Sequence, residues 1–148
     1  MSYQYRFQRI LTLKEKEKDE VQEMYRGSIE KFEKVAEKLY EFLKKKETLE
    51  MHQETKLQNG LSVQHIRHHQ QFLTNLERTI SYYQDLVIQA RNRMNWCEEK
   101  LVDMNVEVKK YEKMKENDLH RFLQTNQQLE NKQLDEVSVV QYMKRGVR

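Results

Sequence analysis

Apolar residues recur alternately every three and four positions from Ile66 to Tyr111, and this pattern constrains the fold more than any other feature. Thirteen of its fourteen positions are apolar, in a chain that is 37% apolar overall: Ile66, His69, Leu73, Leu76, Ile80, Tyr83, Val87, Ala90, Met94, Cys97, Leu101, Met104, Val108 and Tyr111. A spacing that averages 3.5 residues over many turns is typical of a coiled-coil seam, the stripe along which two helices pack. These positions, called the second seam below, predict a long helix that packs against another helix.

The preceding part of the chain carries a similar pattern, called the first seam. Nine of its thirteen positions are apolar: Phe7, Leu11, Lys14, Lys18, Val21, Tyr25, Ser28, Phe32, Val35, Leu39, Phe42, Lys46 and Leu49. At the lysine positions the aliphatic stems can cover apolar surface while the ammonium groups reach water. The first seam therefore predicts a second long helix.

The composition agrees with long helices. The 148 residues include no proline and only three glycines, both of which are disfavoured inside helices. A third of the residues are charged, as expected when most helix positions face water and only a narrow stripe is covered. We expect an elongated, soluble, all-α chain.

One strong turn signal separates the two seams. Asn59 and Gly60 suit the end of a helix, and Ser62 suits the N-cap of the next one. We expect a first helix over residues 3–58, a turn at 59–61, a second helix over 62–130 and a flexible C-terminal tail over 131–148. A short connection makes the helices antiparallel, which predicts a long antiparallel two-helix coiled-coil hairpin forming one domain.

The end of the second seam supports pairing within one chain. Pairing about Gly60 places Phe7 opposite roughly residue 113, and the second seam ends at the same level, where Lys115 and Asp118 take the next positions. A parallel dimer gives no reason for the seam to end there. We therefore expect a monomer. The alternative is a purely structural coiled-coil protein, which could also be a dimer.

Several function classes find little support in the sequence. The 27 basic and 24 acidic residues are interleaved, so nucleic-acid binding is not expected. No glycine-rich phosphate loop or catalytic motif occurs, so we expect no enzyme activity, no cofactor and no metal, although His65 and His69 lie one helical turn apart. Cys97, the only cysteine, fits a reducing compartment, and no membrane insertion is expected.

A second apolar stripe lies beside the one headed by Leu73 and Ile80 and offers a candidate binding surface. Phe72, Leu76, Tyr83 and Leu86 form it, and pairing about Gly60 brings Phe42 and Leu49 near them. A two-stranded coil needs about two apolar positions per heptad, and this stretch has more. The residues could form a docking face for another protein or a locally wide core.

Two segments also resemble the FliJ family, soluble proteins of the bacterial flagellar type III export apparatus. Residues 70–80, QQFLTNLERTI, follow the turn as in the middle of that family, and residues 5–14, YRFQRILTLK, resemble its N-terminal pattern. The resemblance covers essentially the whole chain. It implies a cytoplasmic, non-enzymatic protein that lies at the inner face of the cell membrane through the export apparatus.

The resemblance also implies partners and site residues. The family hairpin is similar to the central stalk of rotary ATPases, inserts its terminal end into a hexameric export ATPase, contacts the membrane export gate and helps to recycle export chaperones. The export-gate residues implied here are Phe42, Leu49, Phe72, Leu76 and Tyr83, while Lys38, Lys45 and Thr79 depart from the family pattern at flanking positions. The expected contacts with the ATPase ring are Phe7, Arg9, Leu11, Lys14, Lys18, Phe122 and Leu129.

Overall fold

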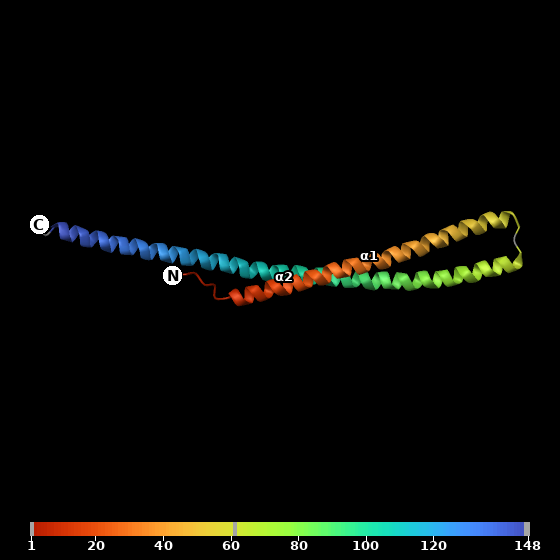
Figure 1. Cartoon of the computed structure of the whole chain (residues 1–148), viewed down its shortest axis with the longest axis horizontal. Coiled ribbons are helices and arrows are strands. Elements are labelled where there is room, and N and C mark those ends of the chain that lie inside the picture. Colours follow the sequence, from red (N-terminus) through yellow and green to blue (C-terminus); the bar gives the residue numbers. More distant parts are fainter. Residues whose placement is uncertain (1, 61, 147–148) are drawn as a thin grey trace. The chain divides into compact units, whose positions relative to one another are not determined.

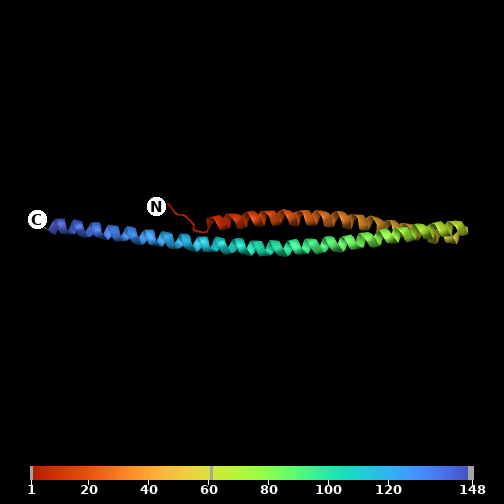
Figure 2. The same cartoon turned by 90° about the horizontal axis from the view of Figure 1, so that it is seen from below.

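The structure is a computed structural model that describes residues 2–60 and 62–146. These residues form two helices, α1 (Gln8–Gln58) and α2 (Val63–Gly146), and the described ranges contain no strand. The two helices pack against each other in opposite directions on either side of the turn near Gly60 (Figure 1, Figure 2). The predicted all-α helical hairpin is confirmed.

Contacts divide the chain into two compact units. The hairpin unit is Asp19–Val102, which contains the turn and the neighbouring parts of both helices. The terminal unit combines the residues up to Lys18 with those from Asp103 onward. Each unit therefore contains one segment from each side of the turn.

The turn follows the predicted chemistry at Gly60 and Ser62. Gly60 adopts a φ of +81°, the left-handed conformation that costs residues with a side chain about 1–2 kcal/mol. Ser62 precedes the first residue of α2, and its Oγ accepts a hydrogen bond from the His65 backbone N–H at 3.4 Å. Gly60 as the left-handed residue and Ser62 as the N-cap are confirmed.

The core of the hairpin unit consists of seam residues from both helices. Its buried side chains are Val21, Ser28, Leu76, Ile80, Ala90 and Cys97. The remaining seam positions of this unit are all partly buried. In the terminal unit, every seam position is either buried or partly buried. The polar Ser28 fits because its hydroxyl donates to the Tyr25 carbonyl at 2.6 Å. Both predicted seams are therefore confirmed.

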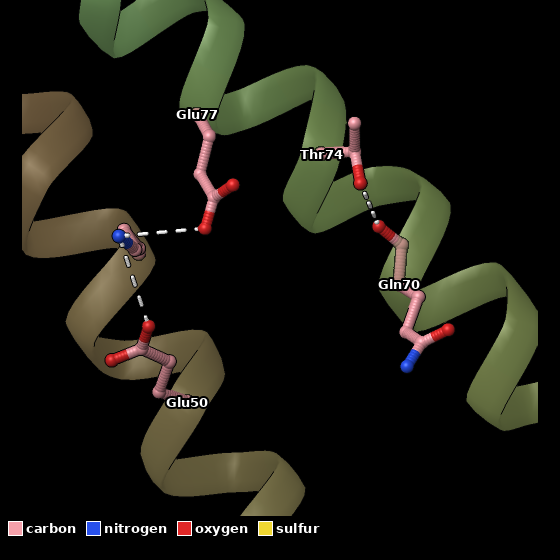
Figure 3. Close-up of polar contacts among 5 residues, drawn as sticks. Glu50, Gln70, Thr74 and Glu77 are labelled. Atoms are coloured by element: carbon pink, nitrogen blue, oxygen red, sulfur yellow. Dashed lines mark hydrogen bonds and ion pairs between the residues drawn. The ribbon is translucent and has the colours of Figure 1, made fainter.

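Lys46 bridges the two helices of the hairpin unit at a seam position. Its Nζ lies 4.0 Å from Glu50 Oε1 on α1 and 3.5 Å from Glu77 Oε1 on α2, and the two carboxylates approach it from different helices (Figure 3). The Lys46 side chain is 33% exposed, so its stem is covered while its charge stays in contact with water. A lysine can therefore occupy this seam position.

In the terminal unit, α1 begins at Gln8 rather than at the predicted residue 3. Residues 2–5 are not helical, and Tyr3 and Tyr5 contact α2 through their hydroxyl groups. Tyr5 joins the buried Leu11 and Val108 in a small core. If α1 began one turn earlier, the chain would carry Tyr5 along a different path.

The helix α2 continues to Gly146, beyond the predicted end at residue 130. Residues 127–146 are helical, and every one of their side chains is exposed. No proline interrupts this stretch, and adding a residue to an existing helix is much easier than starting one. The boundary at 130 was therefore wrong, while flexibility of residues 131–146 stays a prediction. Residues 147–148 of the predicted tail lie outside the described residues, as does residue 61 of the predicted turn.

Candidate interaction surfaces

Phe72 is the one expected gate residue with a largely open side chain. It lies on α2 within the hairpin unit and is 47% exposed. Lys45 on α1 places its Nζ 5.8 Å from the centre of the Phe72 ring, a distance at which a cation is attracted to an aromatic face. Phe72 therefore presents an aromatic surface next to a positive charge.

The other expected gate residues are less accessible. Leu76 is only 6% exposed, so the expectation that it lies on an exposed patch is wrong: it fills the space between the helices. The rings of Phe42 and Tyr83 stack at 5.2 Å with an angle of 27° between their planes, and both residues are half-buried. Leu49 is also half-buried. The wide-core interpretation thus holds for Leu76. The side chains of Phe42, Leu49 and Tyr83 are only partly exposed.

Exposed side chains extend the surface around these edges. Tyr82 is 60% exposed and meets the Tyr83 ring edge-on at 5.4 Å, and Leu43 is 42% exposed. The flanking Lys38 forms an ion pair with Glu41 at 3.8 Å, and the Thr79 hydroxyl donates to the Asn75 carbonyl at 3.1 Å. The sequence reasoning did not identify Tyr82, although its place next to a seam tyrosine is a usable signal.

The expected ATPase-ring residues all lie in the terminal unit. Leu11 is 3% exposed and belongs to the core, so it cannot touch a partner directly. Phe7, Lys14, Lys18 and Phe122 are half-buried, and Lys14 also pairs with Glu17 at 3.7 Å. The open side chains of this set are those of Arg9 and Leu129, the latter 52% exposed.

Tyr3 and Tyr5 make contacts that the sequence reasoning did not anticipate. The Tyr5 hydroxyl donates to the Tyr111 carbonyl at 3.0 Å, and the Tyr3 hydroxyl donates to Asp118 Oδ2 at 3.0 Å. The Tyr3 ring lies 5.3 Å from the Phe122 ring. The sequence did contain a signal for these contacts: Tyr3 and Tyr5 lie two positions apart, just before the first seam.

The surroundings of these two phenols oppose their ionisation. Desolvation, followed by the hydrogen bond to Asp118 and the negative charge of that carboxylate, raises the pKa of Tyr3 above its ordinary value of 10.0. Desolvation also raises the pKa of Tyr5, with smaller contributions from Asp118 and Tyr111. Both hydroxyls are therefore held in the protonated form that donates a hydrogen bond.

Other chemistry finds no assembled site in the part of the chain that the structure describes. Within residues 2–60 and 62–146, no three histidine, cysteine, aspartate or glutamate side chains are grouped to hold a metal ion. Neither described helix combines the length and apolarity needed to cross a bilayer. Trp96 lies under Arg93 and Lys100, whose cationic groups are 4.5 and 4.8 Å from its ring centre. Trp96 is thus partly covered by two cationic side chains of its own helix.

Comparison with known proteins adds the family to this geometry. The family model described as "Flagellar FliJ protein" matches residues 3–147. This chain belongs to the FliJ family. A curated protein of Bacillus subtilis (strain 168), also named "Flagellar FliJ protein", is 50% identical over 146 residues, which cover 99% of each chain. No solved structure matches the chain.

Membership in the FliJ family accounts for the segments that suggested it. The match begins at residue 3, within the non-helical segment that carries Tyr3 and Tyr5, and it extends over the exposed helix beyond residue 126. Both features therefore lie inside the matched region. The family assignment from residues 5–14 and 70–80 is confirmed.

Proposed function

We propose that this chain is a non-enzymatic component of flagellar protein export. In this proposal it is the central stalk of the hexameric export ATPase, couples that ring to the membrane export gate and helps to recycle export chaperones. It would be cytoplasmic and held at the inner face of the membrane by these partners. The observation that carries the proposal is the match to a flagellar family over nearly the whole chain, combined with the two-helix hairpin.

The proposed gate surface centres on Phe72. An aromatic ring that is half open and lies beside a cation can be buried by a partner without unfolding the hairpin. The edges of Phe42, Leu49 and Tyr83 extend the surface, while the buried Leu76 supports it from below. All of these residues belong to the hairpin unit.

The proposed ring contacts lie in the terminal unit. The exposed Arg9 and Leu129 would touch the ATPase directly, with Phe7, Lys14, Lys18 and Phe122 contributing their open edges. Leu11 would act only by holding the N-terminal segment in place, because it is buried with Tyr5 and Val108. The exposed helix beyond residue 126 gives this unit a long surface that its own chain leaves uncovered.

The gate proposal is tested by replacing Phe72 with alanine. We expect Phe72→Ala to weaken capture of the purified gate protein strongly and to reduce motility, with helical content by circular dichroism almost unchanged. Ile88→Ala is the matched control, because Ile88 is also an exposed apolar residue of α2 in the hairpin unit, at 54%. Equal gate binding by both variants would remove Phe72 from the proposed surface.

The ring proposal has a separate test. We expect Leu129→Asp to reduce stimulation of the purified export ATPase. The substitution puts a charge on the exposed apolar side chain among the proposed ring contacts. The matched control is Leu57→Asp, a similarly exposed leucine at 52% in the hairpin unit. If the ATPase responds equally to both variants, Leu129 does not form part of a ring contact.

A further inference from the structure

The hairpin unit contains a cavity next to the turn that the proposed export role does not use. It has a volume of about 400 Å³ and lies between α1 and α2. Leu49 contributes an apolar wall, and the other lining residues are His52, Gln53, Lys56, His65 and His69. Apart from Leu49, none of these belongs to the surface proposed to meet the export gate.

The polar lining of this cavity carries one sign of charge. Lys56 provides a permanent positive charge, and His52, His65 and His69 provide three imidazoles from the two helices. None of the described residues that line it is acidic. The nearby Glu50 is engaged elsewhere, since it pairs with Lys46. Four of the five histidines of the chain fall between residues 52 and 69, which concentrates titratable cations at this end of the unit.

His69 adds a ring nitrogen without a partner. It occupies a seam position, is half-buried, and its Nε2 atom is buried without a hydrogen bond among the described residues. Buried polar atoms of folded proteins are nearly always satisfied by a partner, and one that is not calls for an explanation. A small turn of the His69 ring that uncovers Nε2 would let this atom hydrogen-bond to a ligand in the cavity.

We propose that this cavity binds a glutamate-containing acidic segment of a partner protein. A glutamate side chain fits the lining, because its methylene groups can pack on Leu49 while its carboxylate accepts hydrogen bonds from Lys56 and the imidazoles. A metal ion fits it less well, because the lysine ammonium repels a cation. Free phosphate has no apolar part to pack on Leu49.

The test uses the full chain and a hexaglutamate peptide. Imidazole resonances of the labelled protein are followed by NMR at pH 5.5, with a hexaglutamine peptide as the neutral control. We expect hexaglutamate to shift the resonances of His52, His65 and His69 selectively and to bind at least several-fold more tightly than hexaglutamine. The exposed His68, and His120 of the terminal unit, line no part of the cavity and should shift little.

Matched variants show whether the cavity carries the binding. His65→Gln, His69→Gln and Lys56→Gln should each weaken binding at pH 5.5 several-fold, whereas His68→Gln and Lys44→Gln should not. His65 and Lys56 are exposed, so their replacement leaves the helices folded even if His69→Gln disturbs the seam. Affinity that is equal for hexaglutamate and hexaglutamine, or lost equally in the His68→Gln variant, overturns the proposal. Equal shifts with inorganic phosphate at the same charge concentration would also overturn it.

Discussion

Phe72 and Leu76 lie one turn apart on α2, yet their surroundings differ sharply. Leu76 is 6% exposed and Phe72 is 47% exposed. The first closes the space between two helices, whereas the second leaves much of its ring in water. Similar residues at neighbouring positions can thus serve packing in one case and recognition in the other.

This difference predicts opposite outcomes for two alanine substitutions. Leu76→Ala should lower the free energy of unfolding by about 2–4 kcal/mol, because it removes buried methyl groups and leaves a cavity. Phe72→Ala should lower it by only about 1 kcal/mol, because about half of the ring is already exposed to water. Urea unfolding followed by circular dichroism measures both. A Phe72→Ala variant as unstable as Leu76→Ala would assign Phe72 to the core instead of the surface.

Replacing each of the two described glycines of the hairpin unit by alanine should have opposite effects on the free energy of unfolding. Gly27 lies inside α1 with no atom within 4 Å of the position that a Cβ would take, so Gly27→Ala should raise the free energy of unfolding by about 0.5–1 kcal/mol. Gly60 has a φ of +81°, so Gly60→Ala should lower it by roughly 1 kcal/mol. Thermal unfolding of the two variants checks both signs, and effects of the same sign would contradict the assigned conformations.

At the scale of single residues, the spacing of the seams predicted well which side chains are buried. It predicted less well which side chains beside the seams are exposed. Every seam position from Phe7 to Tyr111 is at least partly buried, because a 3.5-residue repeat fixes which side of a helix meets its partner. Whether a residue beside the seam is covered depends on the partner side chains. Phe42 and Tyr83 cover each other by stacking, and no one-dimensional pattern contains that contact.

At the scale of elements, the non-helical segment ahead of α1 is the main departure from the expected helices. Helix propensity does not forbid a start at residue 3, but the buried Tyr5 ring and three tyrosine hydrogen bonds to α2 favour a non-helical path. These contacts join positions more than a hundred residues apart in sequence. Local sequence patterns therefore could not predict them.

The segment carrying Tyr3 and Tyr5 should detach from α2 at alkaline pH. Because the pKa of each phenol is raised in the folded chain, the folded segment keeps its protons at pH values where the free segment loses them. Its contribution to stability is thus fully present below about pH 10 and is lost as the pH rises through the raised values. Amide exchange of residues 3–8, measured against pH, should accelerate there.

Tyrosine variants separate this effect from general alkaline unfolding. In the Tyr3→Phe, Tyr5→Phe double variant the hydroxyl hydrogen bonds are absent, so the segment should already be looser at neutral pH and lose its alkaline step. Tyr40→Phe is the matched control, since Tyr40 is 63% exposed and lies in the hairpin unit. An alkaline step that persists in the double variant would show that other groups release the segment.

The exposed part of α2 should exchange its amides quickly. Residues 127–146 are helical but have no buried side chain, so only local helix propensity stabilises them. Hydrogen exchange monitored by mass spectrometry should show much weaker protection there than over residues 76–97, where the seam is buried. Equal protection in the isolated chain would mean that a second molecule covers this stretch.

At the scale of the whole molecule, pairing within one chain predicts a monomer. Light scattering on the purified protein should give a mass near 18.3 kDa over a wide concentration range. The alternative, a structural coiled-coil dimer, would give twice that mass. Such a dimer would also be hard to reconcile with the contacts that join Tyr5 to Tyr111 within one chain.

The fold class and the turn could be predicted because they depend on local chemistry and simple symmetry. Gly60, Ser62 and the absence of proline define one reversal between two helices, and the pairing of Lys46 with Glu77 agrees with a reversal near residue 60. The histidine-lined cavity could not be predicted, since it brings His52 and Lys56 together with His65 and His69 across the turn. Its shape depends on how the two helix ends are spaced.

The burial of Cys97 has a practical consequence for labelling. This single thiol of the chain is 1% exposed, so maleimide reagents should leave it unmodified while the protein is folded. A fluorophore or spin label can then be attached to one cysteine introduced on an exposed position, without first removing the native one. Distances to a labelled partner could be measured on a protein whose core is unaltered.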